Sequence, residues 1–234
     1  MKIFAAIPSF NRQDKLIQCI ESIEKNKPFL EGHQLNLGLY FNTVEEVEFF
    51  NDLYILTDWV YPFLLREEHR APDLWNKILE NRGNDVLCYL SDDLELEPTC
   101  LINAINCMAE KFPDLDGVVG MSISNFPENK VVQASFGLIG TKFADRFPNR
   151  HVFCPEYDKF CIDEELELFA KSINKFHYCI DAKLYHHHPA HSDEEPDDTH
   201  RHVRQYLSKD LKQRLLRKQK ELLWGKNFEL IGAK

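Results

Sequence analysis

Apolar and polar positions alternate along the first 120 residues in a way that predicts strands followed by helices. The apolar run over residues 2–7 predicts a strand that Pro8 ends. Apolar residues then recur at helical spacing, so a helix is expected to begin near Asn11 or Gln13. The chain therefore opens with a strand, a turn and a helix.

The remaining pattern predicts further elements of both kinds. Strands are expected over 35–41, within 53–66, over 85–91, over 117–121 and over 178–184, with a strand or hairpin over 131–140. The capping-box spacing of residues 43–46 predicts the start of a short helix. Further helices are expected to run from Pro72 to a point before Gly83, to begin at Pro98, and to cover residues 163–172 and 203–224. Strands that alternate with helices require right-handed crossovers, so we expect an α/β fold with a mainly parallel sheet and helices on both faces.

Composition narrows the class of protein. The chain has 234 residues, of which 44% are hydrophobic, and this suffices for a sizeable core. Its 28 basic and 38 acidic residues give a net charge of -10, which argues against a general nucleic-acid surface but leaves room for an anionic substrate at a bound metal. The N-terminal apolar run is too short for a signal peptide, and no run is long enough to span a membrane, so a soluble cytoplasmic protein is expected. Seven scattered cysteines without a C-x-x-C pair indicate neither a disulfide framework nor a structural zinc site.

Two adjacent carboxylates, Asp92 and Asp93, follow the apolar run over 86–90 directly. Ligands of open α/β sheets bind beyond the carboxyl ends of the strands, which is where this pair is expected to lie. Two charges about 4 Å apart repel by roughly 1 kcal/mol in water and roughly 4 kcal/mol at an effective dielectric constant of 20. A divalent cation such as Mg²⁺ or Mn²⁺ would offset that repulsion. The alternative is that Asp92 caps the next turn and Asp93 is solvated.

Four segments, at residues 3–12, 89–93, 162–166 and 182–189, together resemble nucleotide-sugar glycosyltransferases of the GT-A fold, especially the large family two. Residues 3–12 resemble the opening strand and P-[ST]-[YF]-N-R loop of that family, and residues 89–93 stand where it has its D-x-D-like metal motif. Residues 162–166 are similar to its [ED]-D-x-[ED]-L segment, and residues 182–189 to its v-x-H-x-H ending. The four matches occur in the family's order and span residues 3–189.

The resemblance implies a nucleotide site. Residues Pro8, Ser9, Phe10 and Asn11 would form a wall around the base, and Arg12 would approach phosphate; a simple turn is the alternative. Asn42 stands where the family usually has an Asp-rich loop, and Ser91 replaces an acidic residue of many members. Arg70 and Asn76 occupy the region of a basic residue and an Asn that contact the nucleotide, with ordinary helix-surface polarity as the alternative.

The resemblance also implies a metal site. Asp93 would ligate Mn²⁺ or Mg²⁺ at the donor diphosphate, and Asp92 would reach the metal's waters or the ribose. His186 is the favoured imidazole ligand and His188 the second, because alternate residues of a strand face the same side. The alternative is a surface histidine cluster beside an acidic loop.

Asp163 is the candidate general base that the resemblance implies, with Glu164 and Glu165 as its substitutes. The alternative is an acidic helix N-terminus with Asp163 as the N-cap. The basic helix over 203–224 is expected to be a solvated face, with covering of the site or docking of a partner as alternatives.

These observations predict a GT-A domain over 1–191, with a nucleotide-binding half over 1–97 and an acceptor-side half over 98–191, followed by a linker and C-terminal helix over 192–234. The expected activity is metal-dependent transfer of one sugar from a nucleotide-diphosphate sugar to a hydroxyl of a glycan, a lipid-linked or another acceptor, with inversion. The Q-x-x-R-W signature of processive polysaccharide synthases is absent. The alternatives are nucleotidyl transfer to a sugar phosphate and a non-catalytic nucleotide- or glycan-binding module.

Overall fold

The computed structural model describes residues 1–55, 57–65, 70–80, 83–126, 132–189, 192 and 195–226. Its strands are β1 (Lys2–Pro8), β2 (Gln34–Phe41), β3 (Val60–Leu64), β4 (Val86–Tyr89), β5 (Leu94–Leu96), β6 (Val118–Ile123), β7 (Gly137–Gly140) and β8 (Phe176–His186). Its helices are α1 (Gln13–Asn26), α2 (Val44–Tyr54), α3 (Ala71–Leu79), α4 (Cys100–Lys111), α5 (Thr141–Ala144), α6 (Ile162–Ser172) and α7 (Asp198–Gln219), with 3₁₀ turns at Lys27–Phe29 and Pro148–Arg150.

The strands form one sheet in the order β3-β2-β1-β4-β7-β6-β8-β5. Pairing is parallel between β3, β2, β1 and β4 and between β6 and β8, as the alternating pattern predicts. Strand β7 runs antiparallel between β4 and β6, and β5 runs antiparallel to β8 at the edge. The sequence did not predict β5, because a strand of three residues is too short to show a period.

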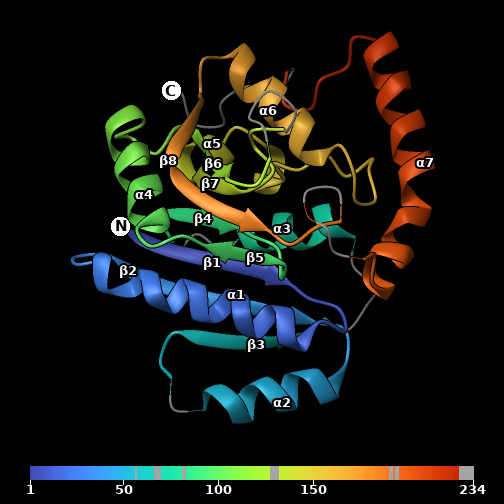
Figure 1. Ribbon diagram of the computed structural model, residues 1–234. Coiled ribbons are helices and arrows are strands. Elements are labelled where there is room, and N and C mark those ends of the chain that lie inside the picture. The colour runs from blue at the N-terminus through green and yellow to red at the C-terminus, as the bar shows by residue number, and fades with distance from the viewer. Residues whose placement is uncertain are drawn as a thin grey trace.

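Helices cover both faces of the sheet (Figure 1), so the α/β expectation is confirmed. On one face, apolar residues of α1, α2 and α4 pack against the inward side chains of β1, β2 and β4. On the other face, α3, α5 and α6 pack with the 152–157 segment against Ala6, Leu87 and Tyr89. Trp59 and Trp75 lie in these two cores.

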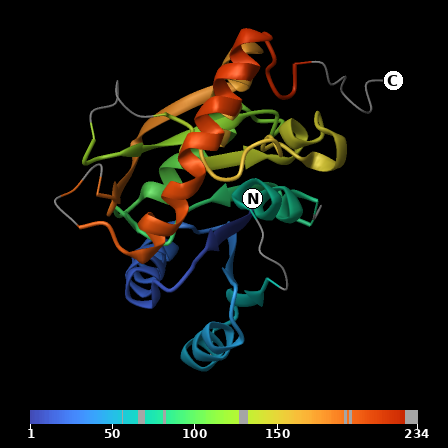
Figure 2. The same ribbon diagram turned by 90° about the vertical axis from the view of Figure 1, so that its right-hand side faces the viewer.

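The C-terminal helix differs from its predicted extent. Helix α7 begins at residue 198 rather than 203 because the Asp197 side chain accepts a hydrogen bond from the His200 backbone in a capping box. Part of the predicted linker is therefore helical, while residues 190, 191, 193 and 194 lie outside the described part of the chain. Turned by 90°, the molecule shows α7 crossing from the N-terminal half toward the C-terminal half (Figure 2). Within the described residues, no helix is long and apolar enough to cross a bilayer.

Two local predictions were wrong. Strand β8 ends at His186. His188 therefore lies beyond the strand, and strand alternation does not place its side chain on the same face as that of His186. Asp163 is not an N-cap: α6 begins at Ile162, and the cap is Cys161 in the left-handed conformation, with φ of 68°. Asp163 instead lies in the first turn, where a carboxylate interacts favourably with the helix dipole.

Candidate active site

The sheet brings three distant segments to one edge. Strands β1 and β4 are parallel neighbours, so the loops that follow Pro8 and Tyr89 leave the sheet at the same edge. Strand β8 has the same direction as β4, because β4 to β7 and β7 to β6 are antiparallel and β6 to β8 is parallel. The end of β8 therefore reaches this edge as well, as an open α/β sheet requires of a binding site.

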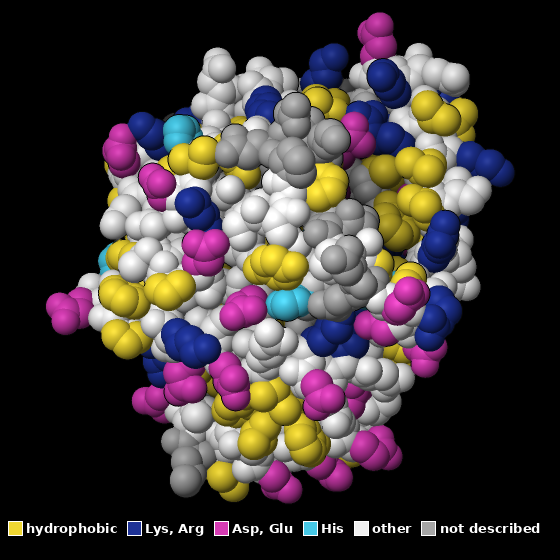
Figure 3. Space-filling view, viewed as in Figure 1, with side chains coloured by type: hydrophobic (Ala, Val, Ile, Leu, Met, Phe, Trp, Pro, Cys, Tyr) yellow, Lys and Arg dark blue, Asp and Glu magenta, His cyan; other side chains and the backbone are white. Residues whose placement is uncertain are grey.

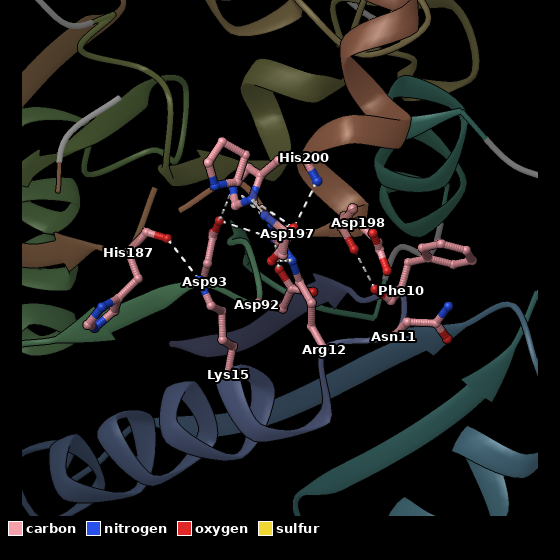
Figure 4. A network of polar contacts seen from close by, with 12 residues as sticks. Phe10, Asn11, Arg12, Lys15, Asp92, Asp93, His187, Asp197, Asp198 and His200 are labelled. Atoms are coloured by element: carbon pink, nitrogen blue, oxygen red, sulfur yellow. Dashed lines mark hydrogen bonds and ion pairs between the residues drawn. The ribbon is translucent and has the colours of Figure 1, made fainter. Parts of the chain in front are cut away.

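The Arg12 guanidinium binds the acid pair (Figure 4). Its Nη1 atom lies 2.9 Å from Asp92 Oδ1 and 3.2 Å from Asp93 Oδ2. Ser9 Oγ donates a hydrogen bond of 2.8 Å to the other oxygen of Asp92. Both aspartates are at least 96% buried, so the alternative of a solvated Asp93 is wrong. In the structure, the positive charge that offsets the repulsion between the carboxylates is that of Arg12.

The loop after β1 is folded so that Arg12 turns inward. Asn11 adopts φ of 53°, a left-handed conformation that asparagine tolerates better than most residues. Its backbone N–H donates to Glu46 Oε1 at 3.0 Å, and Thr43 caps the start of α2 through the backbone N–H of the same Glu46. The predicted capping box thus also anchors the loop that carries Arg12.

The start of α7 closes the other side of Arg12. Asp197 accepts hydrogen bonds from Arg12 Nε and Nη2 at 2.9 and 3.0 Å, and His200 lies 2.9 Å from Nη2. Burial alone would raise the pKa of Asp197, but the Arg12 hydrogen bonds outweigh it and lower the pKa to about 2. Thr199 Oγ1 also donates to the Phe10 carbonyl at 2.8 Å. The predicted linker is therefore part of the site.

Asp93 also meets the end of β8. His186 Nε2 lies 3.3 Å from Asp93 Oδ1, and the His187 backbone N–H donates to the Asp93 carbonyl at 2.8 Å. Burial alone would raise the pKa of Asp93, but His186 and Arg12 hold it well below its usual value. The His188 ring lies 5.2 Å from that of His186 and 4.7 Å from that of His200, between centroids. The predicted metal residues are thus brought together around one ionised carboxylate.

Asp93 and His186 are the two residues that would hold a divalent cation, and only together with oxygen atoms of a bound substrate. Among the residues described, no three His, Cys, Asp or Glu side chains form a complete metal cage. Asp93 and His186 offer one carboxylate and one imidazole, and Mg²⁺ usually takes one or two carboxylates and fills its shell with phosphate oxygens and water. Imidazole also suits Mn²⁺ as a ligand beside carboxylate, though a softer one.

Asp163 is placed for a different role. It accepts a hydrogen bond of 3.1 Å from Ser135 Oγ and one of 3.0 Å from the Glu164 backbone. Burial raises the pKa of Asp163, which these hydrogen bonds only partly oppose. A carboxylate whose pKa is raised is a stronger base than an ordinary one.

Lys159 is another charged residue of this half of the molecule. Burial lowers the pKa of Lys159, against the attraction of Asp92, Asp93 and Asp163. Its backbone is held by Asp210 of α7, a fully buried carboxylate that accepts hydrogen bonds of 2.8–2.9 Å from the N–H groups of residues 158, 159 and 160. The Lys159 backbone is thus fixed by α7, and no sequence motif indicated this residue.

Glu164 and Glu165 do not join this group. Glu165 is 99% buried and accepts hydrogen bonds from Arg217, from Tyr157 Oη at 2.6 Å and from the Trp224 backbone at 2.6 Å. Glu164 forms an ion pair of 2.8 Å with Arg214. The geometry contradicts Glu165 as a substitute base, because its oxygens are already used to fix α7 to α6.

Two predicted nucleotide residues also lie apart from the acid pair. Asn76 is buried and exchanges two hydrogen bonds, of 2.7 and 2.8 Å, with the backbone of Phe153, so its predicted contact with a nucleotide is wrong. Arg70 is paired with Asp73 at 2.7 Å and donates to the Pro155 carbonyl. Both residues hold α3 to the 153–158 loop.

The other predicted nucleotide residues lie at the ends of the strands. Asn42 is exposed directly after β2, and Pro8 closes β1. Ser91 Oγ lies 3.5 Å from Asp92 Oδ1. An open cavity of about 540 Å³ lies at the start of α1, lined by residues 11–15 and Asp197. Its volume is in the range of small-molecule sites, about 300–1,000 Å³.

Sequence reasoning missed Asp197, His200, Lys159 and Asp210. An Asp-x-x-His spacing at a helix start is a recognisable cap, but it does not show what else the cap touches. Asp210 looks like one polar residue in a basic helix. Asp197 and His200 meet Arg12, and Asp210 meets residues 158–160, across at least 50 positions of the chain, so these contacts follow from the tertiary structure alone.

Comparison with known proteins gives no match in sequence and clear matches in structure. No protein-family model and no curated protein matches the chain. The Pyrobaculum calidifontis mannosyltransferase PcManGT, solved with GDP-Man and Mn²⁺, matches with a TM-score of 0.65 and 11% identity over 93% of this chain and 64% of that one. Staphylococcus aureus TarS 1–349 matches with a TM-score of 0.60 and 12% identity, over 80% of this chain and 60% of that one.

The same TarS fragment in complex with UDP-GlcNAc matches with a TM-score of 0.57 and 13% identity, over 79% of this chain and 58% of that one. Aligned regions thus span about three-fifths of the length of these solved chains. At such low identities the likeness concerns the fold. The chain has the GT-A fold of nucleotide-sugar glycosyltransferases, as its four sequence segments predicted.

Proposed function

We propose that this protein transfers one sugar from a nucleotide-diphosphate sugar to an acceptor hydroxyl, with Mn²⁺ or Mg²⁺ and with inversion at the anomeric carbon. The observation that carries the proposal is the convergence of Arg12, Asp93 and His186 at the carboxyl edge of the sheet. Solved proteins of this fold that bind GDP-Man with Mn²⁺ or UDP-GlcNAc support the donor class.

The leaving diphosphate needs positive charge, because negative charge develops on it as the glycosidic bond breaks. A cation held by Asp93 and His186 would supply Lewis-acid stabilisation of that charge. Arg12 is the protein's own cation beside the acid pair. Arg12 would orient phosphate oxygens through its planar fork of donors.

Asp163 would accept the acceptor proton. As that proton moves to Asp163, the acceptor oxygen attacks the anomeric carbon from the face opposite the nucleotide diphosphate, which leaves with the bonding electron pair. The raised pKa of Asp163 supports this role. The division into a nucleotide half over 1–97 and an acceptor half over 98–191 belongs to the same proposal.

A thermal-melting screen of nucleotide diphosphates with and without Mn²⁺ tests the binding step. A ligand at a hundred times its dissociation constant should add about 2.7 kcal/mol to the free energy of unfolding. We expect the diphosphate of one nucleoside to stabilise the protein, and to do so much more in the presence of Mn²⁺. Asp93→Asn should abolish the metal-dependent part, whereas Glu95→Gln, on the surface two residues away, should not.

Turnover distinguishes the enzyme from the alternatives. Release of nucleotide diphosphate from the matching donor sugar, at a rate that falls when metal is chelated, would support the transferase. Stabilisation without turnover toward any acceptor or water would mean a binding module. Pyrophosphate release from a nucleoside triphosphate and a sugar phosphate would mean nucleotidyl transfer.

A further inference from the structure

Helix α7 buries a few charged side chains against the protein and exposes three leucines among other charged residues. Its fully or mostly buried side chains include Asp210 and Arg217. Leu211, Leu215 and Leu216 are 47–60% exposed. A surface helix of a globular protein normally buries its apolar stripe and exposes its charges. On α7, leucines stand instead on the exposed side, among lysines and arginines.

Polar contacts attach the inner face of α7 to the rest of the domain. Asp210 accepts three backbone hydrogen bonds from residues 158–160. Arg217 binds Glu165 and Glu156, and Arg214 binds Glu164. The leucines of the outer face are therefore not needed to attach α7 to its own domain, and a different role must account for them.

Basic residues flank the exposed leucines. At 100° per residue, Leu211 and Leu215 of α7 project in nearly one direction, with Lys212 and Lys218 on either side. All of these side chains are exposed, as is Arg204 one turn before Ser208. Hydrophobic side chains interspersed with lysine and arginine are visible along α7 (Figure 3). This surface of α7, defined by residues 204, 211, 212, 215 and 218, is the leucine–lysine face.

We propose that the leucine–lysine face binds the surface of an anionic lipid bilayer. Leucines that enter the headgroup boundary and lysines that reach anionic headgroups are the combination by which helices lie in a membrane interface. The positive charge is local, since the chain as a whole carries -10, so attraction to an anionic surface must be directed through this face.

Other occupants fit less well. A second copy of the chain in a two-fold contact would place the same lysines against each other. A nucleic acid would use the charges but leave the leucines in water, and the chain lacks an overall positive charge. The membrane proposal does not depend on the proposed reaction, because it rests on the outer face of α7 alone.

Co-sedimentation with vesicles tests it. The full-length protein is mixed, without donor or metal, with vesicles of phosphatidylcholine alone or of phosphatidylcholine with phosphatidylglycerol. We expect binding to the anionic vesicles only, and weaker binding as salt increases, because salt screens exposed charges. Absence of binding to the anionic vesicles would overturn the proposal.

Paired variants identify the face. Leu211→Gln with Leu215→Gln, and separately Lys212→Glu with Lys218→Glu, should each lower the partition coefficient at least about tenfold. Leu53→Gln with Ile55→Gln removes equally exposed side chains from the end of α2 and should bind as wild type. Wild-type binding by both α7 variants, or an equal loss in the α2 control, would contradict the proposal. So would analytical ultracentrifugation that shows a dimer which the Leu211→Gln, Leu215→Gln variant dissociates.

Discussion

The guanidinium of Arg12 lies 2.9 Å from the carboxylate of Asp92, although 80 residues separate the two in the chain. Both side chains are buried, and Asp93 shares the same guanidinium nitrogen. The protein therefore compensates the charge of two buried carboxylates with a cation of its own. A bound divalent ion would add charge to a site that is already partly neutralised.

Arg12→Met should destabilise the protein by about 3–5 kcal/mol at neutral pH, because it leaves buried carboxylates without their partner. Arg12 and His186 depress the folded pKa of Asp93, so its stabilising contribution is present above the ordinary pKa of 3.8 and is lost as pH falls through the lowered value. The difference between wild type and variant should therefore shrink toward acid. Urea denaturation as a function of pH measures this. Arg201→Met is the control, because its side chain is 64% exposed and its ion pair is worth at most about 1 kcal/mol.

Asp163→Asn should lower kcat by about 10²–10⁴-fold without loss of donor binding, because a positioned base contributes that much to the rate. In the wild type, the pH profile of kcat/KM should rise through an apparent pKa above 3.8, since burial raises the pKa of Asp163. Ser135→Ala should move this limb to higher pH, because it removes a hydrogen bond that favours the ionised form. A profile that stays unchanged in Ser135→Ala would argue against Asp163 as the titrating group.

Glu165→Ala should cost about 3–5 kcal/mol of stability, because it leaves Arg217 without the buried carboxylate that it binds. The turnover rate of the folded fraction should be unchanged. Glu164→Ala is a control from the adjacent position, since its partly exposed ion pair with Arg214 should be worth at most about 1 kcal/mol. Chemical denaturation and active-site titration together separate the two effects. A specific loss of kcat in Glu165→Ala would restore its catalytic candidacy.

Asp210→Asn should lower the free energy of unfolding by about 2–4 kcal/mol, because hydrogen bonds to a charged acceptor are worth about 1.5–3 kcal/mol each and the amide weakens three of them. The KM for the donor should rise, since the loop that carries Lys159 loses its anchor. Asp198→Asn, on the same helix with a 92% exposed side chain, should change neither quantity. Equal stability of the two variants would show that the clamp contributes nothing.

Local pattern was sufficient for most of the fold. Some elements depend only on residues within a few positions of one another, namely strand β1, helix α1 and the capping box before α2. The hydrophobic periodicity of the sequence predicts such local elements well. Strand β5 and the direction of β7 depend on pairing with distant strands, which no local period encodes. The family resemblance supplied the overall architecture that these short segments could not.

The candidate site divides in the same way. Asp92 and Asp93 were found because a buried strand that ends in two charges is locally anomalous. Asn76 and Glu165 were assigned by their position within a motif, but both side chains turn into the protein to satisfy buried polar groups. Asp197 was overlooked because nothing in residues 192–198 indicates that it meets an arginine 185 positions away.

The short ladder between β5 and β8 pairs Leu94 with His186, one position from Asp93. Because successive side chains of a strand point to opposite faces, a slip by a single residue would turn His186 away and present His187 instead. An insertion or deletion within β8, between the bulge opposite Met121 and His186, would thus leave the protein folded but turn His186 away from Asp93. A change in the length of this strand would therefore remove the proposed imidazole ligand while the fold stays the same.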